Sequence, residues 1–436
     1  MRLTRYTFAF MLVSFISVQA AISDNSIDPD LAASFFREAQ EQCAQDNGHL
    51  WGQSLCVPMA FIHPETRQFV ANQQDSAETL TKQGDVYIGS WPANFPVANS
   101  TWSYNGVKWT TLVWPPADNK TTRKALMLHE SFHNIQEELG FPATSPKNPH
   151  LSTRDGRIWL RVEWAALKAA LKRPGHDRQA RIYDALVFRA YRRSLFPGSR
   201  ETENQFELHE GVAEYTGMRL CGLPLSEAQL FLADSVFKWQ MDVPSFESSF
   251  AYVSGPAYGL LLDELNPNWR KELKPESDFG FLLLSASNIT LPENLEGAAG
   301  ERMADYDGEA VRTEETNREL EHLRKIIDYQ ARLVDGPVLI IPLQEMNIQY
   351  DPRGIMSLHD LGTIYPVIRV SDVWGILTVT GNGALMAPNW NQITIPAPDE
   401  FESNPVTGNG WTLELNEGWK VITAKRVGDY TLDKSD

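Results

Sequence analysis

The spacing of apolar residues changes twice along this chain, and that change limits the folds that it can adopt. Up to about residue 121 the apolar residues form short β-branched and aromatic runs; from Thr122 to about Val334 they recur at helical spacing. Beyond Gly336 short apolar runs return, separated by Gly, Pro and Asn. We therefore predict an α+β protein in which an antiparallel sheet is followed by a mainly helical part and then by a C-terminal all-β domain.

The first residues are typical of a secretory signal peptide. Arg2 and Arg5 precede an apolar run that ends near Val18, and small residues at Val18 and Ala20 suit cleavage after residue 20. The run is shorter than a comfortable membrane span, and no later stretch is long enough. We expect residues 1–20 to be removed and the mature protein to be secreted or periplasmic, without a membrane span.

Residues 21–121 are predicted to contain one helix and the sheet. The helix is expected at 28–44, and strands at 59–62 and 68–71 flank a turn. Asn105-Gly106, which lies between two tryptophan-containing runs, predicts a β-hairpin.

Residues 122–335 are predicted to be helical, with an acidic loop inserted. Gly and Pro residues mark the ends of the helices. In addition to the helix that begins at Thr122, helices are expected at 158–171, 178–195, 203–221, 226–239 and 317–334, and the loop at 296–315.

Residues 336–436 are predicted to form a separate β domain. The apolar runs that we assign to its strands are 338–341, 365–370, 374–379, 392–395 and 411–415.

The net charge excludes one class of function, and the cysteine content predicts a disulfide. The formal net charge of −17 argues against a nucleic-acid-binding surface, which needs a basic face. Three cysteines are present, and Cys43 and Cys56 are spaced for a local disulfide worth about 3 kcal/mol. Cys221 follows an apolar helix end and is expected to be a buried, inert thiol.

The most specific motif is His129-Glu130-Ser131-Phe132-His133, inside the helix that begins at Thr122 and stops at Gly140. Histidines four positions apart stand one above the other on a helix and can bind one Zn²⁺ together. Glu130 is placed to reach a metal-bound water, as a general base would. Catalytic zinc normally has three protein ligands, so a third is needed.

A second motif, His209-Glu210-Gly211-Val212-Ala213-Glu214-Tyr215, supplies candidates for that ligand. Here the chain resembles the gluzincins, the thermolysin-like and aminopeptidase N-like zinc hydrolases, in which a glutamate on a later helix is the third ligand. The resemblance implies a zincin-like catalytic region, one zinc ion, and Glu210 as the third ligand. It also implies that Glu214 accepts a hydrogen bond from a zinc histidine. His209 is the alternative third ligand.

The chain departs from the gluzincin pattern in its spacing. His133 and Glu210 are 77 positions apart, and the predicted helices at 158–171 and 178–195 would form an inserted hairpin that accounts for the difference.

A third segment, Phe250 to Gly259, resembles the aminopeptidase N-like Y-x-K-G element, although Ser254 stands where that element has lysine. The resemblance implies that Tyr252 stabilises the oxyanion of the reaction, and Tyr258 is its rival in the same segment.

We therefore expect an exported zinc-dependent peptidase that hydrolyses peptides or proteins, with Glu130 as general base. The alternatives are a zinc hydrolase of another amide or ester, and a non-catalytic zinc-containing binding protein. The G-x-M-E-N segment of aminopeptidases is missing, so aminopeptidase activity is not supported. The predicted strand at 107–114 is a candidate edge on which an extended peptide could align.

Overall fold

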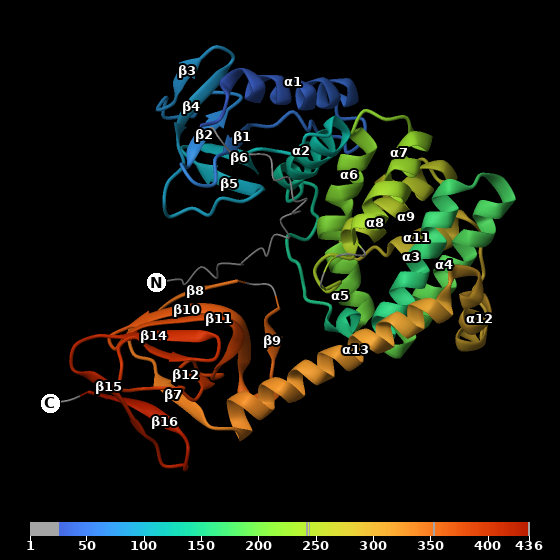
Figure 1. The fold of residues 1–436 in the computed structure, drawn as a ribbon. Helices are drawn as coiled ribbons and strands as arrows, with labels where there is room; N and C mark the ends of the chain where they lie inside the picture. Colours follow the sequence, from blue (N-terminus) through green and yellow to red (C-terminus); the bar gives the residue numbers. More distant parts are fainter. Residues whose placement is uncertain (1–25, 241–242, 244, 352–353, 435–436) are drawn as a thin grey trace. The chain divides into compact units, whose positions relative to one another are not determined.

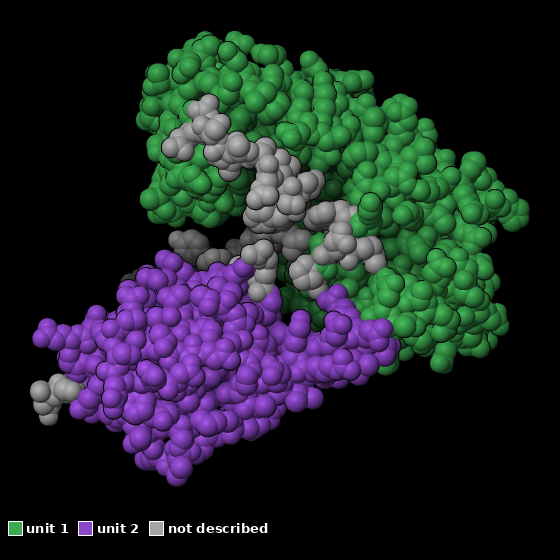
Figure 2. All heavy atoms as spheres, in the orientation of Figure 1, with its two compact units in different colours: residues 1–315 green, residues 316–436 purple. Residues whose placement is uncertain are grey.

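The computed structural model of the 436-residue chain describes residues 26–240, 243, 245–351 and 354–434 (Figure 1). The predicted signal peptide, residues 1–20, lies outside these ranges. No helix within them is both long and apolar enough to cross a membrane. The chain divides into two compact units at residues 315 and 316, which Figure 2 colours separately.

The first unit begins with a helix and a six-stranded sheet. Asp28 caps helix α1 (Pro29–Asp46), accepting hydrogen bonds from two backbone N–H groups of its first turn. The strands follow in the order β3-β4-β2-β1-β6-β5 across the sheet. They are β1 (Met59–Ile62), β2 (Gln68–Ala71), β3 (Thr81–Gln83), β4 (Val86–Ser90), β5 (Ser100–Tyr104) and β6 (Val107–Val113).

The sheet is mixed, so the prediction of an antiparallel sheet was wrong. Strand β1 pairs with β6 in parallel, with Phe61 opposite Leu112, whereas the other neighbours are antiparallel. Local turns predict the hairpins, including β5–β6 with Trp102 opposite Trp109, but they carry no information on pairing between strands far apart in the chain. The expected edge at residues 107–114 was also wrong, because β6 lies between β1 and β5.

The two faces of the sheet bury different side chains because successive residues of a strand point in opposite directions. Met59 and Phe61 of β1 belong to a cluster with residues of α1 and with Met127 of the following helix. Ala60 and Ile62 belong to a second cluster on the other face, which contains Trp91 and Trp109. Figure 1 shows α1 beside the sheet.

The disulfide between Cys43 and Cys56 is confirmed, and Cys221 is a buried free thiol, as expected. The loop that the disulfide closes carries Trp51, whose ring packs 5.2 Å from that of Phe132. The Trp51 indole N–H donates to Thr216 Oγ1 at 3.0 Å. The disulfide loop is therefore anchored on the helices that follow the sheet.

Helices make up the rest of the first unit. They are α2 (Lys120–Ile135), α3 (Arg154–Lys172), α4 (Gly175–Leu195), α5 (Ser199–Phe206), α6 (Val212–Leu220), α7 (Leu225–Phe231), α8 (Phe237–Gln240), α9 (Ala251–Leu265), α10 (Trp269–Glu272), α11 (Phe279–Ala286), α12 (Leu295–Arg302) and the start of α13 (Gly308–Gln330). In this unit two predicted helices contain π-helical turns, η2 (Glu207–Gly211) between α5 and α6, and η3 (Leu232–Val236) between α7 and α8.

Helices α3 and α4 pack on each other and contribute buried residues to the same core as α2, α6 and α9. They were expected to form an inserted hairpin. In the structure they are not an excursion from the core but belong to the same core as the elements that carry the two motifs.

The acidic segment 296–315, expected as a loop, is largely helical, so that prediction was wrong. It comprises most of α12, a 3-10 turn η4 (Met303–Tyr306) and the start of α13. Glu315 is 3% exposed and pairs with Arg157 and Arg161, with N–O distances of 2.7 Å to each. The acidic side chains of this segment suggested a solvated loop. In the structure, Glu315 instead connects α13 to α3 through these two ion pairs.

The second unit contains the end of α13, a π-helical turn η5 (Ala331–Asp335), a 3-10 turn η6 (His359–Leu361) and a ten-stranded sheet. The C-terminal region is β-rich, as expected. Its strands are β7 (Val338–Pro342), β8 (Asn347–Tyr350), β9 (Met356–Ser357), β10 (Thr363–Asp372), β11 (Gly375–Met386), β12 (Gln392–Pro396), β13 (Val406–Gly408), β14 (Trp411–Leu415), β15 (Trp419–Thr423) and β16 (Tyr430–Lys434).

Candidate metal centre

Helix α2 carries both motif histidines. Asn119 caps its N-terminus, and Leu128 and Phe132 are fully buried in the core. His129 and His133 lie one helical turn apart, so their rings stand together on the face that meets α6.

The third candidate ligand lies on the π-helical turn η2. The N–H of Val212 donates to the carbonyl of Glu207, five residues earlier, where an α-helix would use a four-residue step. The sequence predicted one uninterrupted helix from 203 to 221. Because a π turn adds a residue, it changes the directions in which Glu210 and the residues after it project, and such turns are frequent at functional sites.

Two glycine contacts allow the site helices to approach closely. A Cβ on Gly217 of α6 would lie 2.3 Å from the carbonyl oxygen of Ala125 on α2. A Cβ on Gly255 of α9 would lie 2.2 Å from the Cα of Gly211. Larger side chains would push α2, η2 and α9 apart, and with them the three segments that carry the candidate site.

The structure brings His129, His133 and Glu210 together, with one ligand atom of each within 4.8 Å of the others. Glu210 Oε2 lies 3.6 Å from His129 Nε2 and 3.5 Å from His133 Nε2, and the two Nε2 atoms are 3.1 Å apart. Ligand atoms about 2.0–2.1 Å from a tetrahedral zinc ion are about 3.3 Å from one another. The three atoms thus have the spacing of one face of such a tetrahedron.

The Nδ1 atom of each histidine ring, which points away from Glu210, contacts a hydrogen-bond acceptor. His129 Nδ1 lies 2.8 Å from Glu214 Oε2, and His133 Nδ1 lies 2.6 Å from Gln136 Oε1. A carboxylate and an amide oxygen can only accept, so both Nδ1 atoms carry protons. Both Nε2 atoms then face the space beside Glu210 and are the ring atoms left for a shared proton or a metal ion.

The charges around this space favour a cation. Burial disfavours a charged ring, but the carboxylates of Glu210 and Glu214 raise the pKa of His129 well above its ordinary value. Burial would raise the pKa of Glu210, yet the two histidines hold it well below the usual range. His129, His133 and Glu210 thus form a largely buried group whose charges could hold a divalent metal ion in place of protons.

Glu130 is 2% exposed, and burial raises the pKa of its carboxyl group. Its Oε2 atom is buried and has no hydrogen-bond partner among the described residues. Buried polar atoms are seldom left unpaired, so this oxygen is available to a ligand such as water. That is the environment expected of a general base at a metal centre.

The two tyrosines of the third motif lie in different surroundings. Tyr252 stacks on the His129 ring, with ring centres 5.8 Å apart, and its hydroxyl donates to Glu210 Oε2 at 2.8 Å. Tyr258 is fully buried and donates to Glu163 at 2.9 Å. Of the two, Tyr252 is at the cluster, and in the structure its hydroxyl contacts the candidate ligand itself.

His209, the alternative third ligand, is beside the cluster but not part of it. Its Nδ1 faces Ser145 Oγ at 2.8 Å and Glu210 Oε1 at 3.3 Å, and burial lowers the pKa of its ring to about 4. Because one nitrogen faces both neighbours, the three residues do not form a serine–histidine–acid relay, in which the ring uses both of its nitrogens.

Gln136 was not among the predicted site residues, although it lies three positions after His133, a spacing at which helix residues touch. A buried network of acids and arginines that contacts η2 was not predicted either. Glu207 pairs there with Arg189, which is 3% exposed. Arg189 comes from α4, so no local spacing connects this ion pair with the two motifs.

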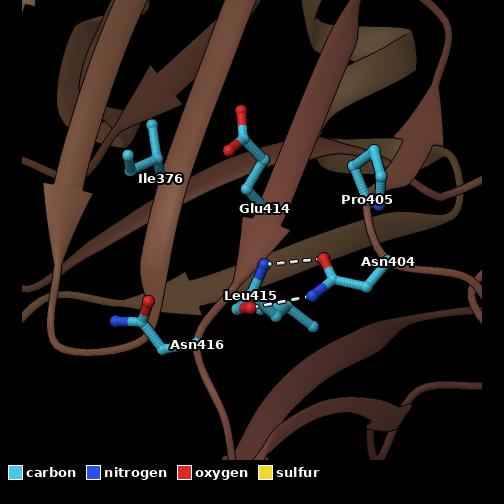
Figure 3. Close-up of a pocket in the computed structure, with 6 residues that line it drawn as sticks. All are labelled: Ile376, Asn404, Pro405, Glu414, Leu415 and Asn416. Atoms are coloured by element: carbon cyan, nitrogen blue, oxygen red, sulfur yellow. Dashed lines mark hydrogen bonds between the residues drawn. The ribbon is translucent and has the colours of Figure 1, made fainter.

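The second unit has a pocket, which Figure 3 shows. Asn404 lines it, but its side chain is bonded to the backbone N–H and carbonyl of Leu415 at 2.9 and 2.8 Å. Asn416 similarly donates to the carbonyl of Val373. These amides hold loops together, and none of His129, His133 and Glu210 lines this pocket.

No protein-family model, curated protein or solved structure matches this chain.

Proposed function

We propose that this protein is an exported zinc-dependent peptidase of the gluzincin type, with His129, His133 and Glu210 as zinc ligands. The observation that carries the proposal is the arrangement of two histidine Nε2 atoms and one carboxylate oxygen at mutual distances of 3.1 to 3.6 Å. The disulfide between Cys43 and Cys56 fits an oxidising compartment, and the N-terminal sequence supports export.

The donor set favours zinc or another transition metal over calcium and magnesium. Imidazole nitrogens with a single carboxylate suit zinc, iron and similar metals, whereas calcium and magnesium prefer sites made of oxygen ligands. Among the transition metals, the H-E-x-x-H pattern on one helix is typical of zinc. Three protein ligands leave a fourth position open, as in catalytic zinc sites; structural sites are usually closed by four.

The surrounding residues support hydrolysis. Zinc in a site of this kind lowers the pKa of a coordinated water toward neutrality and polarises a carbonyl oxygen. In this proposal Glu130 accepts the proton of the water and returns it to the leaving amine. Tyr252 stabilises the negative charge that develops on the carbonyl oxygen, once its hydroxyl exchanges Glu210 for substrate.

A peptide-library digest tests the activity. The mature protein loaded with zinc is expected to cleave peptides, and both a chelator and Glu130→Gln are expected to abolish cleavage, the latter without loss of zinc. Cleavage by Glu130→Gln at the wild-type rate would contradict the mechanism. Zinc-dependent hydrolysis of ester or other amide substrates alone would identify a different zinc hydrolase, and zinc binding without any hydrolysis would indicate a binding protein.

Elemental analysis tests the ligand set. About one zinc per chain is expected, with most of it lost in His129→Ala, His133→Ala and Glu210→Ala. His209→Ala is the matched control, since it removes a neighbouring imidazole that lies outside the cluster. Full zinc in Glu210→Ala together with loss in His209→Ala would transfer the third ligand to His209.

A further inference from the structure

Gln136 is a buried amide that contacts three segments of the site. It follows α2 directly, is 2% exposed, and its Oε1 atom lies 2.6 Å from His133 Nδ1. Its Nε2 atom donates to the carbonyl of Pro142 at 2.8 Å and to that of His209 at 3.2 Å. One side chain therefore links the second histidine to the loop after α2 and to the π-helical turn.

The surroundings leave one orientation for this amide. Its nitrogen is near the carbonyl oxygens of Pro142 and His209, and a third carbonyl, that of Leu208, lies 3.5 Å away. Only the NH₂ end of an amide can donate to carbonyl oxygens, so Oε1 has to face His133. Oε1 can only accept, and it therefore requires a proton on His133 Nδ1.

Gln136 affects the metal site in two ways. A protonated Nδ1 keeps the lone pair of the His133 ring on Nε2, which faces Glu210 Oε2 at 3.5 Å. The bond to the His209 carbonyl also holds the residue that directly precedes Glu210. Gln136 thus acts on two of the three candidate ligands at once.

We propose that Gln136 is a positioning residue of the metal centre, which sets the tautomer of His133 and ties that histidine to the turn that carries Glu210. Glu214 performs the first of these tasks for His129 through a charged acceptor. Gln136 performs it for His133 through a neutral one, without adding a further negative charge. This inference rests on the proposed function, because it assumes that His133 and Glu210 bind zinc.

The test is Gln136→Met in the mature full-length protein, with the zinc dissociation constant measured by competition with a chromogenic chelator. Methionine keeps the length of the side chain but neither accepts from His133 nor donates to the carbonyls. We expect the dissociation constant to rise about 10 to 100-fold, as is usual when a residue that orients a metal ligand is lost. The visible absorption spectrum of the cobalt-substituted protein is expected to change, since it reports ligand geometry.

Gln229→Met is the matched control. Gln229 is also 2% exposed and donates to a backbone carbonyl, that of Leu260, but contacts none of the candidate ligands. It is expected to lower stability without moving the zinc affinity or the cobalt spectrum. If Gln136→Met does not fold, nitrogen NMR of the wild-type protein labelled in its histidines still tests the tautomer, and a proton on His133 Nε2 in the metal-free state at high pH overturns the proposal.

The outcomes separate this inference from the proposed function. A zinc affinity of Gln136→Met within threefold of wild type, with zinc lost in His129→Ala, overturns the role of Gln136 alone. A wild-type protein that binds no zinc overturns both.

Discussion

The Nε2 atoms of His129 and His133 lie 3.1 Å apart while both Nδ1 atoms are held by acceptors. Two nitrogen lone pairs at this distance repel each other unless a cation is shared between them, either a proton or a metal ion. The neighbouring carboxylates raise the pKa of both rings despite their burial, so the metal-free protein is expected to hold a proton here. Binding zinc then releases that proton, and zinc affinity is expected to rise with pH.

Glu214→Ala should weaken zinc binding about 10 to 100-fold while leaving all three candidate ligands in place. The reason is the 2.8 Å contact between Glu214 Oε2 and His129 Nδ1, which orients the ring and increases its basicity as a ligand. The zinc dissociation constant measures this. Glu138→Ala, which removes an exposed acid in the turn after α2, is the control and should have the wild-type value. An unchanged constant for Glu214→Ala would show that the contact is not maintained in solution.

Tyr252→Phe should lower kcat about 10² to 10³-fold, with little change in KM, because an oxyanion donor acts mainly in the transition state. Because the same hydroxyl contacts Glu210 Oε2, the zinc affinity of this variant has to be measured as well. Unchanged zinc affinity together with the lower kcat would support the oxyanion role, whereas a parallel loss of zinc would mean that Tyr252 holds Glu210. Tyr258→Phe removes a hydroxyl bonded to the buried Glu163 and should affect stability more than kcat.

Asp278→Asn should lower the free energy of unfolding by about 3 kcal/mol at pH 7, because it removes one of the buried carboxylates that offset the charges of Arg189 and Arg193. Asp278 is 8% exposed and pairs with Arg193 at 2.8 Å and Arg200 at 3.0 Å. Burial would raise its pKa, but Arg189, Arg193 and Arg200 lower it well below the ordinary value of 3.8. An acid whose pKa is lower in the folded state than in the unfolded state stabilises the fold at pH values above its unfolded-state pKa. This stabilisation is lost as the pH falls from the unfolded-state pKa through the folded-state pKa.

The difference between wild type and Asp278→Asn should therefore be largest at neutral pH and shrink as the pH falls from about 4 toward 2. Urea unfolding at several pH values measures it. Asp85→Asn, in an exposed pair with Arg37, should change stability by less than about 0.5 kcal/mol. A difference for Asp278→Asn that is independent of pH would mean that its charge contributes nothing.

Gly217→Ala should destabilise the first unit by about 1–3 kcal/mol and also weaken zinc binding. The added Cβ would lie 2.3 Å from the carbonyl oxygen of Ala125 and 3.3 Å from the Cβ of His129, so α6 and α2 have to separate at the site. Thermal unfolding and the zinc dissociation constant report the two effects. Gly300→Ala on α12 meets no atom within 4 Å and should instead stabilise by about 0.5–1 kcal/mol. Equal effects of the two substitutions would argue against a close α2–α6 contact.

Features that depend on neighbours along the chain could be predicted from the sequence. The one-turn spacing of His129 and His133, the hairpin at Asn105-Gly106 and the disulfide across thirteen positions each involve residues that a helix, a turn or a short loop brings together. The grouping of Glu210 with the histidines was reached only through a resemblance between motifs, because no local rule spans 77 positions.

Tertiary structure alone decided which distant elements meet, and with what geometry. The parallel pairing of β1 with β6 and the bond from Gln136 to the π-helical turn that carries Glu210 both join segments far apart in the chain. Apolar periodicity reports which face of an element is buried, but not which partner buries it. The sequence by itself therefore determined the candidate ligands and the elements that carry them. Their convergence was decided by packing, since the close approach at Gly217 and Gly211 exists only when α2, α6 and α9 lie against one another.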